Sequence, residues 1–218
     1  MTVLSATSWA TNADMILDVV DLGLIKPTDQ VLDLTWGRGT WWKKYDHPTG
    51  IVANVGLGPS DRFVGLKSIR VHHDYRDLPI EWADSFHVVC FDPPYIAMGG
   101  RKTSGLHDFM DRFGLEAAPG DPKSLHEYNV RGLAEAMRVC TPKGFVMTKC
   151  ADYISSGRLQ LGSHWMLEDA LNLGLKVHDK LIHVGHARVQ PGGRRTVHAR
   201  QNTSVLWIFQ KPAARRKK

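Results

Sequence analysis

The stretch VLDLTWGRGTWW, from Val31 to Trp42, decides the fold class. Its first residues form a short apolar run typical of a buried strand, and Asp33 and two glycines, Gly37 and Gly39, come at its end. Glycines just past a strand let the backbone approach a ligand closely, and the helix that we expect next would offer free N–H groups. The stretch therefore predicts a ligand-binding turn at the carboxyl end of a strand.

The turn does not fit a dinucleotide site. The dinucleotide fingerprint needs a third small residue three positions after the second glycine, where strand and helix pack tightly. Trp42 occupies that position, and Asp33, ahead of Gly37, is an addition that the fingerprint does not require. The indole at this position argues against a nicotinamide or flavin site.

The rest of the chain alternates between strand-like and helix-like segments. Further apolar runs predict strands at 51–55, 68–72, 87–91, 144–150, 176–189 and 202–210. Helical spacing predicts helices at 13–21, capped by Asn12, at 122–140, begun by Asp121-Pro122, and at 163–173, ended by Gly174. Such alternation is typical of parallel βαβ units, with room only for short helices between the second, third and fourth strands. The last two strands flank Gly192-Gly193 and predict an antiparallel hairpin.

The strand at 87–91 ends in FDPPY, from Phe91 to Tyr95. Asp92 then lies at the carboxyl end of a buried strand, where open α/β sheets bind their ligands. The two prolines fix φ and remove two backbone donors, so the carbonyls beside Asp92 are left as rigid acceptors. The alternative is that Pro93-Pro94 only ends the strand.

Composition favours one soluble domain. The chain has 218 residues, of which 43% are hydrophobic, enough for one sizeable core. We expect a single domain over 1–212 and a basic tail at 213–218. The sequence shows neither a signal peptide nor an apolar run of the roughly 20 residues that span a bilayer, so we expect a cytoplasmic protein.

Charge favours a polyanionic partner. The net charge is +6, and basic residues concentrate at 192–200 and 214–218. The cysteines Cys90, Cys140 and Cys150 lack CxxC spacing, which favours reduced core residues. The histidines at 72–73, 183 and 186 have no carboxylate or cysteine at ligand spacing, so we expect no metal site.

Two motifs together resemble a known family. Asp33-x-x-x-Gly37-x-Gly39 after the first strand, with Asp92-Pro93-Pro94-Tyr95 after the fourth, looks like the amino-methyltransferases that use S-adenosylmethionine, in particular the DNA N6-adenine and N4-cytosine enzymes. The resemblance covers the order of elements from about residue 12 to 210. It implies a Rossmann-like class I methyltransferase fold: a seven-stranded, mostly parallel sheet with an antiparallel last strand and helices on both faces.

The resemblance also implies where S-adenosylmethionine binds. Gly37 and Gly39 would admit its methionine part, Asp33 would place its ammonium group, and Asp74 would accept from its adenine amino group. The acid that usually holds the ribose is missing after the second strand, and Asn54 or Asp61 is the available substitute. The expected cofactor-binding residues are Asp33, Thr35, Trp36, Gly37, Gly39, Asn54, Asp74 and Tyr75.

The catalytic residues that the resemblance implies are those of the second motif. The lone pair of an exocyclic amine is delocalised into the base, so an enzyme must accept hydrogen bonds from both N–H groups. Asp92 and the Pro93 carbonyl would be the two acceptors, and Pro94 would stiffen the segment. Tyr95 would stack on a base taken out of the helix.

The substrate is less well defined. Aspartate at the first position favours adenine N6 over cytosine N4, but similar motifs serve RNA base methyltransferases and enzymes that methylate glutamine amides. Basic charge favours nucleic acid over protein, and we expect DNA rather than RNA. A non-catalytic nucleic-acid-binding relative is the alternative from another class, because the ribose acid is missing.

Several basic residues are candidate substrate contacts. The segment 96–123 is far longer than a usual connection, and it predicts either a lid that carries Arg101 and Lys102 or a surface insertion. Lys149 ends the fifth strand, and Arg194 and Arg195 follow the Gly192-Gly193 turn. Each is interpreted as a phosphate contact or as ordinary solvated charge.

Overall fold

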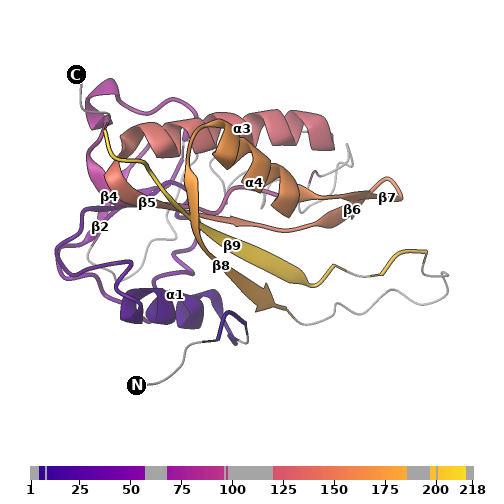
Figure 1. The fold of residues 1–218 in the computed structure, drawn as a ribbon, viewed down its shortest axis with the longest axis horizontal. Coiled ribbons are helices and arrows are strands. Elements are labelled where there is room, and N and C mark those ends of the chain that lie inside the picture. The colour runs from indigo at the N-terminus through magenta and orange to yellow at the C-terminus, as the bar shows by residue number, and fades with distance from the viewer. Residues whose placement is uncertain are drawn as a thin grey trace.

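The structure is a computed structural model, and it describes residues 5–7, 9–56, 68–95, 97, 120–185, 197–199 and 201–214. Figure 1 shows a sheet with helices packed on it. The described elements are α1 (Asn12–Asp21), β1 (Val31–Asp33), β2 (Ile51–Asn54), β3 (Ser68–Val71), the short 3₁₀ helix η1 (Ile80–Trp82), β4 (Phe86–Phe91), α3 (Pro122–Val139), β5 (Cys140–Cys150), β6 (Tyr153–Ser155), β7 (Arg158–Gln160), α4 (Gly162–Asn172), β8 (Lys176–Val184) and β9 (Thr203–Gln210).

The main sheet has seven strands in the order β3-β2-β1-β4-β5-β9-β8. The strands from β3 to β5 pair in parallel, and β9 pairs antiparallel with both β5 and β8. The predicted mostly parallel sheet with an antiparallel last strand is confirmed. A separate two-stranded hairpin, β6 with β7, was not predicted, because strands of three residues carry too little periodicity.

Both faces of the sheet are covered, as predicted (Figure 1). Side chains alternate along each strand, so Val31 and Val88 pack on the α1 side, whereas Leu32 and Val89 pack on the side of α3 and α4. Gly132 brings α3 very close to the sheet, because a Cβ there would lie 2.6 Å from the ring of Phe91. The end of β4 is therefore held firmly from both sides.

The helix ends agree with the sequence except at α1. The side chain of Thr11, not Asn12, caps α1 by accepting a hydrogen bond from Asp14 N at 3.2 Å. Asn12 is the first helical residue, so the predicted cap is wrong by one position. At α3 the predicted start at Asp121-Pro122 is confirmed, and Asp121 caps the helix by accepting from the backbone N–H of Lys123 and Ser124.

The glycine turn does not lead into the helix that the sequence analysis expected. Within 34–50 the chain forms successive turns instead, with hydrogen bonds from Gly39 N to Trp36 O (2.8 Å) and from Trp42 N to Gly39 O (3.1 Å). These bonds span three residues, whereas an α-helix spans four. Both glycines have positive φ, 53° at Gly37 and 60° at Gly39, which breaks any regular helix.

The remaining boundaries differ in small ways. The connection from β3 to β4 contains only η1, and β5 begins at Cys140, before the expected start at 144. β8 ends at Val184, and the predicted turn at 192–193 lies outside the described residues, as does 57–67 between β2 and β3.

The described residues carry neither a membrane span nor a metal cluster. No helix in the described ranges is long and apolar enough to cross a bilayer. The same ranges contain no group of three or more histidine, cysteine or acidic side chains that could hold a metal ion. Cys90, Cys140 and Cys150 are all buried and free, and burial raises the pKa of each thiol above its ordinary value.

Candidate active site

Two acids meet at the carboxyl ends of neighbouring parallel strands. Asp33 ends β1 and Asp92 directly follows β4, and the two strands pair in parallel with Asp33 opposite Cys90. Thr35 joins the two acids: its backbone N–H donates to Asp33 Oδ1 at 3.0 Å, and its hydroxyl oxygen accepts from Asp92 N at 2.7 Å. The turn after β1 is thereby tied to the motif after β4.

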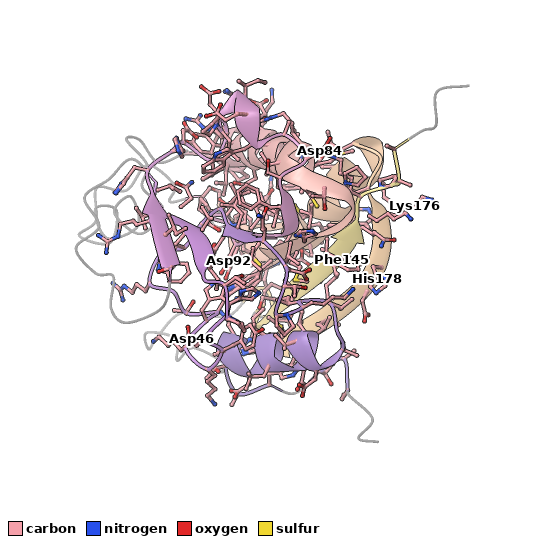
Figure 2. All side chains as sticks on the ribbon, turned by 90° about the vertical axis from the view of Figure 1, so that its left-hand side faces the viewer. Asp46, Asp84, Asp92, Phe145, Lys176 and His178 are labelled. Atoms are coloured by element: carbon pink, nitrogen blue, oxygen red, sulfur yellow. The ribbon has the colours of Figure 1, made fainter. Side chains whose placement is uncertain are left out.

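Two consecutive indoles complete this network. Trp42 Nε1 donates to Asp33 Oδ2 at 2.7 Å, and Trp41 Nε1 donates to Asp92 Oδ2 at 3.2 Å. Both tryptophans are buried, whereas Asp92 is partly exposed; it lies near the middle of the molecule in the view of Figure 2. Indole is a donor only, so each ring nitrogen needs an acceptor when buried. Sequence reasoning missed these roles, although two tryptophans just after a glycine pair, in a chain with two strand-end acids, were the available signal.

Asp33 is turned into the protein. Only 5% of the residue is exposed, and burial raises the pKa of its carboxyl to about 7, with the charge of Asp92 adding to the effect. The hydrogen bonds from Trp42 and Thr35 act in the opposite direction. Both carboxyl oxygens therefore accept hydrogen bonds from the turn and stabilise its backbone conformation. A direct contact between Asp33 and the ammonium group of a ligand would require these hydrogen bonds to rearrange.

The side-chain amide of Asn54, at the end of β2, forms all of its hydrogen bonds with backbone groups. Its Nδ2 donates to the carbonyls of Leu34 (3.1 Å) and His73 (3.0 Å), while its Oδ1 accepts from the N–H groups of His73 (2.9 Å) and Gly56 (3.4 Å). The residue is only 1% exposed. These bonds use the donors and acceptor of the amide, so Asn54 joins three strand ends and has no remaining group for a ribose hydroxyl.

Asp74 and Tyr75, which follow β3, point in different directions. Burial would raise the pKa of Asp74, but hydrogen bonds and charge from Arg76 outweigh it and hold that pKa below the usual value. Arg76 Nε lies 2.9 and 3.1 Å from the two carboxylate oxygens, and the guanidinium lies over the Tyr128 ring at 3.6 Å. Asp74 thus remains an ionised, partly exposed acid at the sheet edge.

Tyr75 belongs to the core. It is 2% exposed and packs edge-on against Phe91, with ring centroids 5.3 Å apart. Within the described part of the chain its buried hydroxyl has no hydrogen-bond partner. The structure therefore places Asp74, and not Tyr75, where a ligand could reach it.

The glycine turn is covered by its own tryptophan. A Cβ on Gly39 would lie 2.8 Å from the Trp36 indole, so only glycine fits beneath that ring. Trp36 is itself buried, and its backbone N–H donates to Asn54 O at 3.1 Å. Thr35, Trp36, Gly37 and Gly39 therefore lie together at the ends of β1 and β2, as the sequence indicated.

The two prolines of the second motif present different carbonyls. Pro94 O accepts a hydrogen bond from Asn129 Nδ2 on α3 at 2.7 Å, whereas no hydrogen bond from the described residues reaches Pro93 O. Asn129 is buried on the sheet-facing side of α3, a polar residue in an apolar stripe that sequence reasoning overlooked. It fixes the Pro94 peptide and leaves the Pro93 carbonyl as a rigid acceptor beside Asp92.

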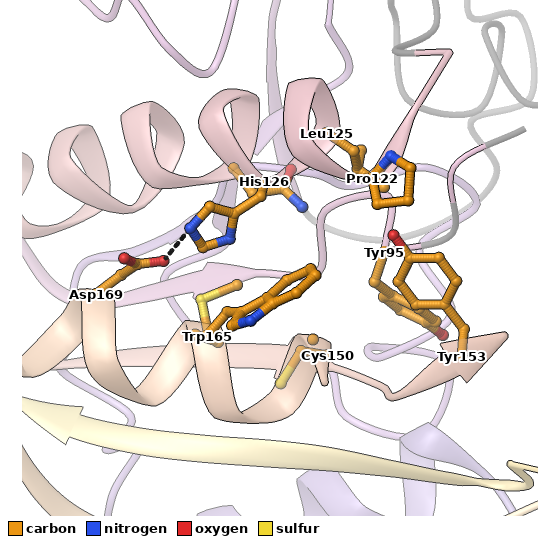
Figure 3. A pocket seen from close by; sticks show the side chains of 11 residues that line it. Tyr95, Pro122, Leu125, His126, Cys150, Tyr153, Trp165 and Asp169 are labelled. Atoms are coloured by element: carbon orange, nitrogen blue, oxygen red, sulfur yellow. Dashed lines mark ion pairs between the residues drawn. The ribbon is translucent and has the colours of Figure 1, made fainter. Parts of the chain in front are cut away.

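Tyr95 stands between two hollows of different size. The smaller, of about 30 Å³, lies between α3 and α4 beside Tyr153 and Trp165, where His126 forms an ion pair with Asp169 at 3.4 Å (Figure 3). The larger, of about 570 Å³, lies at the ends of β5, β8 and β9 and is lined by Lys149. Ligand sites measure roughly 300 to 1,000 Å³, while a water needs only about 15 Å³, so of these two hollows among the described residues the larger is the one that can hold a base.

Some candidate residues lie outside the described part of the chain. Arg101, Lys102, Arg194 and Arg195 belong to this group, as do Asp61 and most of the loop at 96–123. Of the expected substrate contacts, Lys149 is described, and it lies near the carboxyl end of β5, where it lines the larger hollow.

Comparison with known proteins defines the fold class. No protein-family model matches the sequence, and no curated protein matches it. Among solved structures, a SAM-dependent methyltransferase from Methanosarcina mazei is 10% identical with a TM-score of 0.53, over 89% of this chain and 98% of that one. The cyclase SpnF is 12% identical with a TM-score of 0.56, over 93% and 81%. The chain therefore has a class I methyltransferase fold.

A third similar structure is a putative DNA modification methylase from Thermus thermophilus, in complex with S-adenosyl-L-methionine. It is 18% identical with a TM-score of 0.43, over 66% of this chain. The match spans only 56% of the length of that methylase. Because a cyclase shares the fold, the fold alone does not define the reaction, and the site must be argued from its own residues.

Proposed function

We propose that the protein is an S-adenosylmethionine-dependent methyltransferase that acts on an exocyclic amine of a nucleic-acid base, with adenine N6 of DNA as the target. The observation that carries this proposal is the pair of acceptors after β4. Asp92 is oriented by Trp41 at 3.2 Å, and the adjacent Pro93 carbonyl has no partner in the described part of the chain. Two fixed acceptors side by side match the two N–H groups of an exocyclic amine.

The described residues fit the cofactor at two points. The turn at Gly37 and Gly39 offers backbone in the left-handed region, close to the sheet, and Asp74 offers an ionised carboxylate at the end of β3. S-adenosylmethionine would supply an electrophilic methyl group on a sulfonium sulfur. Asp33 would act from behind the turn, because its oxygens already bind Thr35 and Trp42.

The chain's own contribution is positioning and charge. Asp92 and the Pro93 carbonyl would accept the two N–H hydrogen bonds and favour a pyramidal nitrogen, and Asp92 would hold the proton that the amine loses. Trp41 fixes Asp92, and Asn129 fixes the next peptide, so little reorganisation is needed when charge develops. Tyr95, at the mouth of the larger hollow, would stack on the base.

The choice of target rests on two observations. Aspartate as the first residue of the Asp92 motif favours adenine over cytosine in the family that the sequence resembles, and the net charge of +6 favours nucleic acid. An RNA base is the second candidate, since charge acts on either polymer. A non-catalytic nucleic-acid-binding protein is the third, because the buried amide of Asn54 is already bonded within the protein.

The deciding experiment offers DNA and RNA together with radioactive S-adenosylmethionine and then digests the labelled polymer to nucleosides. We expect the label in N6-methyldeoxyadenosine. Label in a ribonucleoside would move the target to RNA. Cofactor binding measured by calorimetry without any label in nucleic acid would contradict the proposal, and absence of cofactor binding would favour the non-catalytic alternative.

A further inference from the structure

A buried lysine lines the larger hollow. Lys149, near the end of β5, is only 5% exposed. Among the described residues its ammonium group has no hydrogen bond and no carboxylate in ion-pair contact. The ammonium group is not among the fully buried side-chain atoms without a partner, so it faces the space of the hollow that Lys149 lines. An anion bound in the hollow would meet an ammonium group that no carboxylate among the described residues contacts.

Lys149 is level with the proposed catalytic acid. β4 and β5 pair in parallel with Phe91 opposite Thr148, so Asp92 and Lys149 occupy the next position on each strand. Because side chains alternate along a strand, both leave the sheet on the side of α1. Neighbouring strands lie about 5 Å apart, so a ligand of nucleotide size can contact both residues.

The rest of the lining suits a nucleotide. Tyr95 and Tyr153 supply aromatic surface, and Asn12, Gln201 and Asn202 supply amides. Asp152 is the one acid among the described lining residues, and its Oδ1 already accepts from Ser163 N at 2.9 Å and from Ser163 Oγ at 2.7 Å, at the start of α4. The acid is therefore engaged away from Lys149.

We propose that this hollow binds the sugar and phosphate of one nucleotide, with the phosphate on Lys149. A volume of about 570 Å³ accommodates a mononucleotide. The orientation of the bound nucleotide, with its base toward Asp92, rests on the proposed function, whereas the phosphate contact with Lys149 does not. Lys149 is the one lysine or arginine among the described lining residues, which matches a single phosphate group, and lysine binds phosphate as a compact point charge.

The test compares deoxyadenosine 5′-monophosphate with deoxyadenosine by calorimetry on the full chain, without cofactor. We expect the nucleotide to bind at least tenfold more tightly than the nucleoside. Lys149→Met, which fills the same space without charge, should remove that preference and leave nucleoside binding within about twofold of wild type.

Two further variants keep the result interpretable. Lys149→Arg retains the charge and should retain most of the preference. Lys143→Met removes an exposed charge from the other end of β5 and should change nothing. Equal binding of nucleotide and nucleoside by the wild type, no binding of either, or an unchanged preference in Lys149→Met would each overturn the proposal.

The outcome is separable from that of the proposed function. A phosphate preference that depends on Lys149, in a protein that methylates no base, would retain the nucleotide site and reject the reaction. Methyl transfer by a Lys149→Met protein with unchanged KM for DNA would do the opposite. Adenosine 5′-monophosphate in the same titration shows whether the site favours ribose over deoxyribose.

Discussion

The two halves of the sheet's carboxyl edge use their polar side chains differently. At the ends of β1 and β2, the polar groups of Asp33, Thr35 and Asn54 form hydrogen bonds with other residues of the protein. At the ends of β4 and β5, the Pro93 carbonyl and Lys149 have no partner among the described residues. The first half is built to hold a backbone shape, and the second half presents groups that a ligand would satisfy.

The difference has a physical reason. A turn that must approach a ligand closely with bare backbone needs its neighbours to fix it, because glycine alone is conformationally permissive. Groups that act on a substrate must instead be oriented in advance, so that they need not reorganise when charge develops. Trp41 bridges the two halves, since it follows the glycine turn in sequence and orients Asp92 in space.

The sharpest way to test the second half is Asp92→Asn. The amide keeps the shape but loses the negative charge, so methyl transfer should fall by about a thousandfold or more, ~4 kcal/mol in transition-state stabilisation. Calorimetry should show cofactor affinity within about threefold of wild type. Asp84→Asn is the matched control, because Asp84 is an exposed acid just before the start of β4, whereas Asp92 follows its end; both are labelled in Figure 2. Equal loss of transfer and of cofactor binding would remove the assigned role.

In the first half, the raised pKa of Asp33 predicts that the unfolding free energy depends on pH. Its folded pKa of about 7 lies above the ordinary value of 3.8, so the folded state binds the proton more tightly and Asp33 costs stability as pH rises. This cost is absent below pH 4 and complete above pH 7. Relative to Asp33→Asn, the wild type should therefore lose about 2 kcal/mol of unfolding free energy between pH 5.5 and 8.5. Urea unfolding of both proteins measures the difference, and a constant gap would contradict the raised pKa.

The bridge between the halves is tested by Trp41→Phe. The ring remains but the donor to Asp92 is lost, so kcat should fall about tenfold, ~1.4 kcal/mol, with the KM for S-adenosylmethionine within about twofold. Trp82→Phe is the control, because this indole lies beside Phe86, near the opposite end of β4. A similar fall in both variants would reduce the role of Trp41 to general packing.

The smallest effect is expected at Tyr75. Its buried hydroxyl has no partner in the described residues, so Tyr75→Phe should leave cofactor affinity unchanged and raise the unfolding free energy by up to about 1 kcal/mol. Asp74→Asn, one residue earlier, should weaken cofactor binding instead. If Tyr75→Phe weakened binding as much as Asp74→Asn, the expected cofactor role of Tyr75 would be restored.

The sequence by itself determined the sheet and the positions at which its strands end. Apolar runs and glycines are local signals, so the strands near 31, 51, 68 and 87 and the start of α3 at Asp121-Pro122 were found from short windows. The same windows placed Asp33, Asp74 and Asp92 at one edge, because carboxyl ends of parallel strands share an edge.

Only the tertiary structure decided what each polar group contacts. Asn129 lies 35 residues from Pro94 and Trp41 lies 51 residues from Asp92, and no local pattern records such pairs. The turns in place of a helix after Gly39 also depend on distant partners, since two indoles reach inward to two acids. Hydrogen bonds between segments far apart in the chain are set by tertiary packing. For this reason the positions of the strand ends were predictable from the sequence, whereas the contacts and roles of the polar groups at those ends were not.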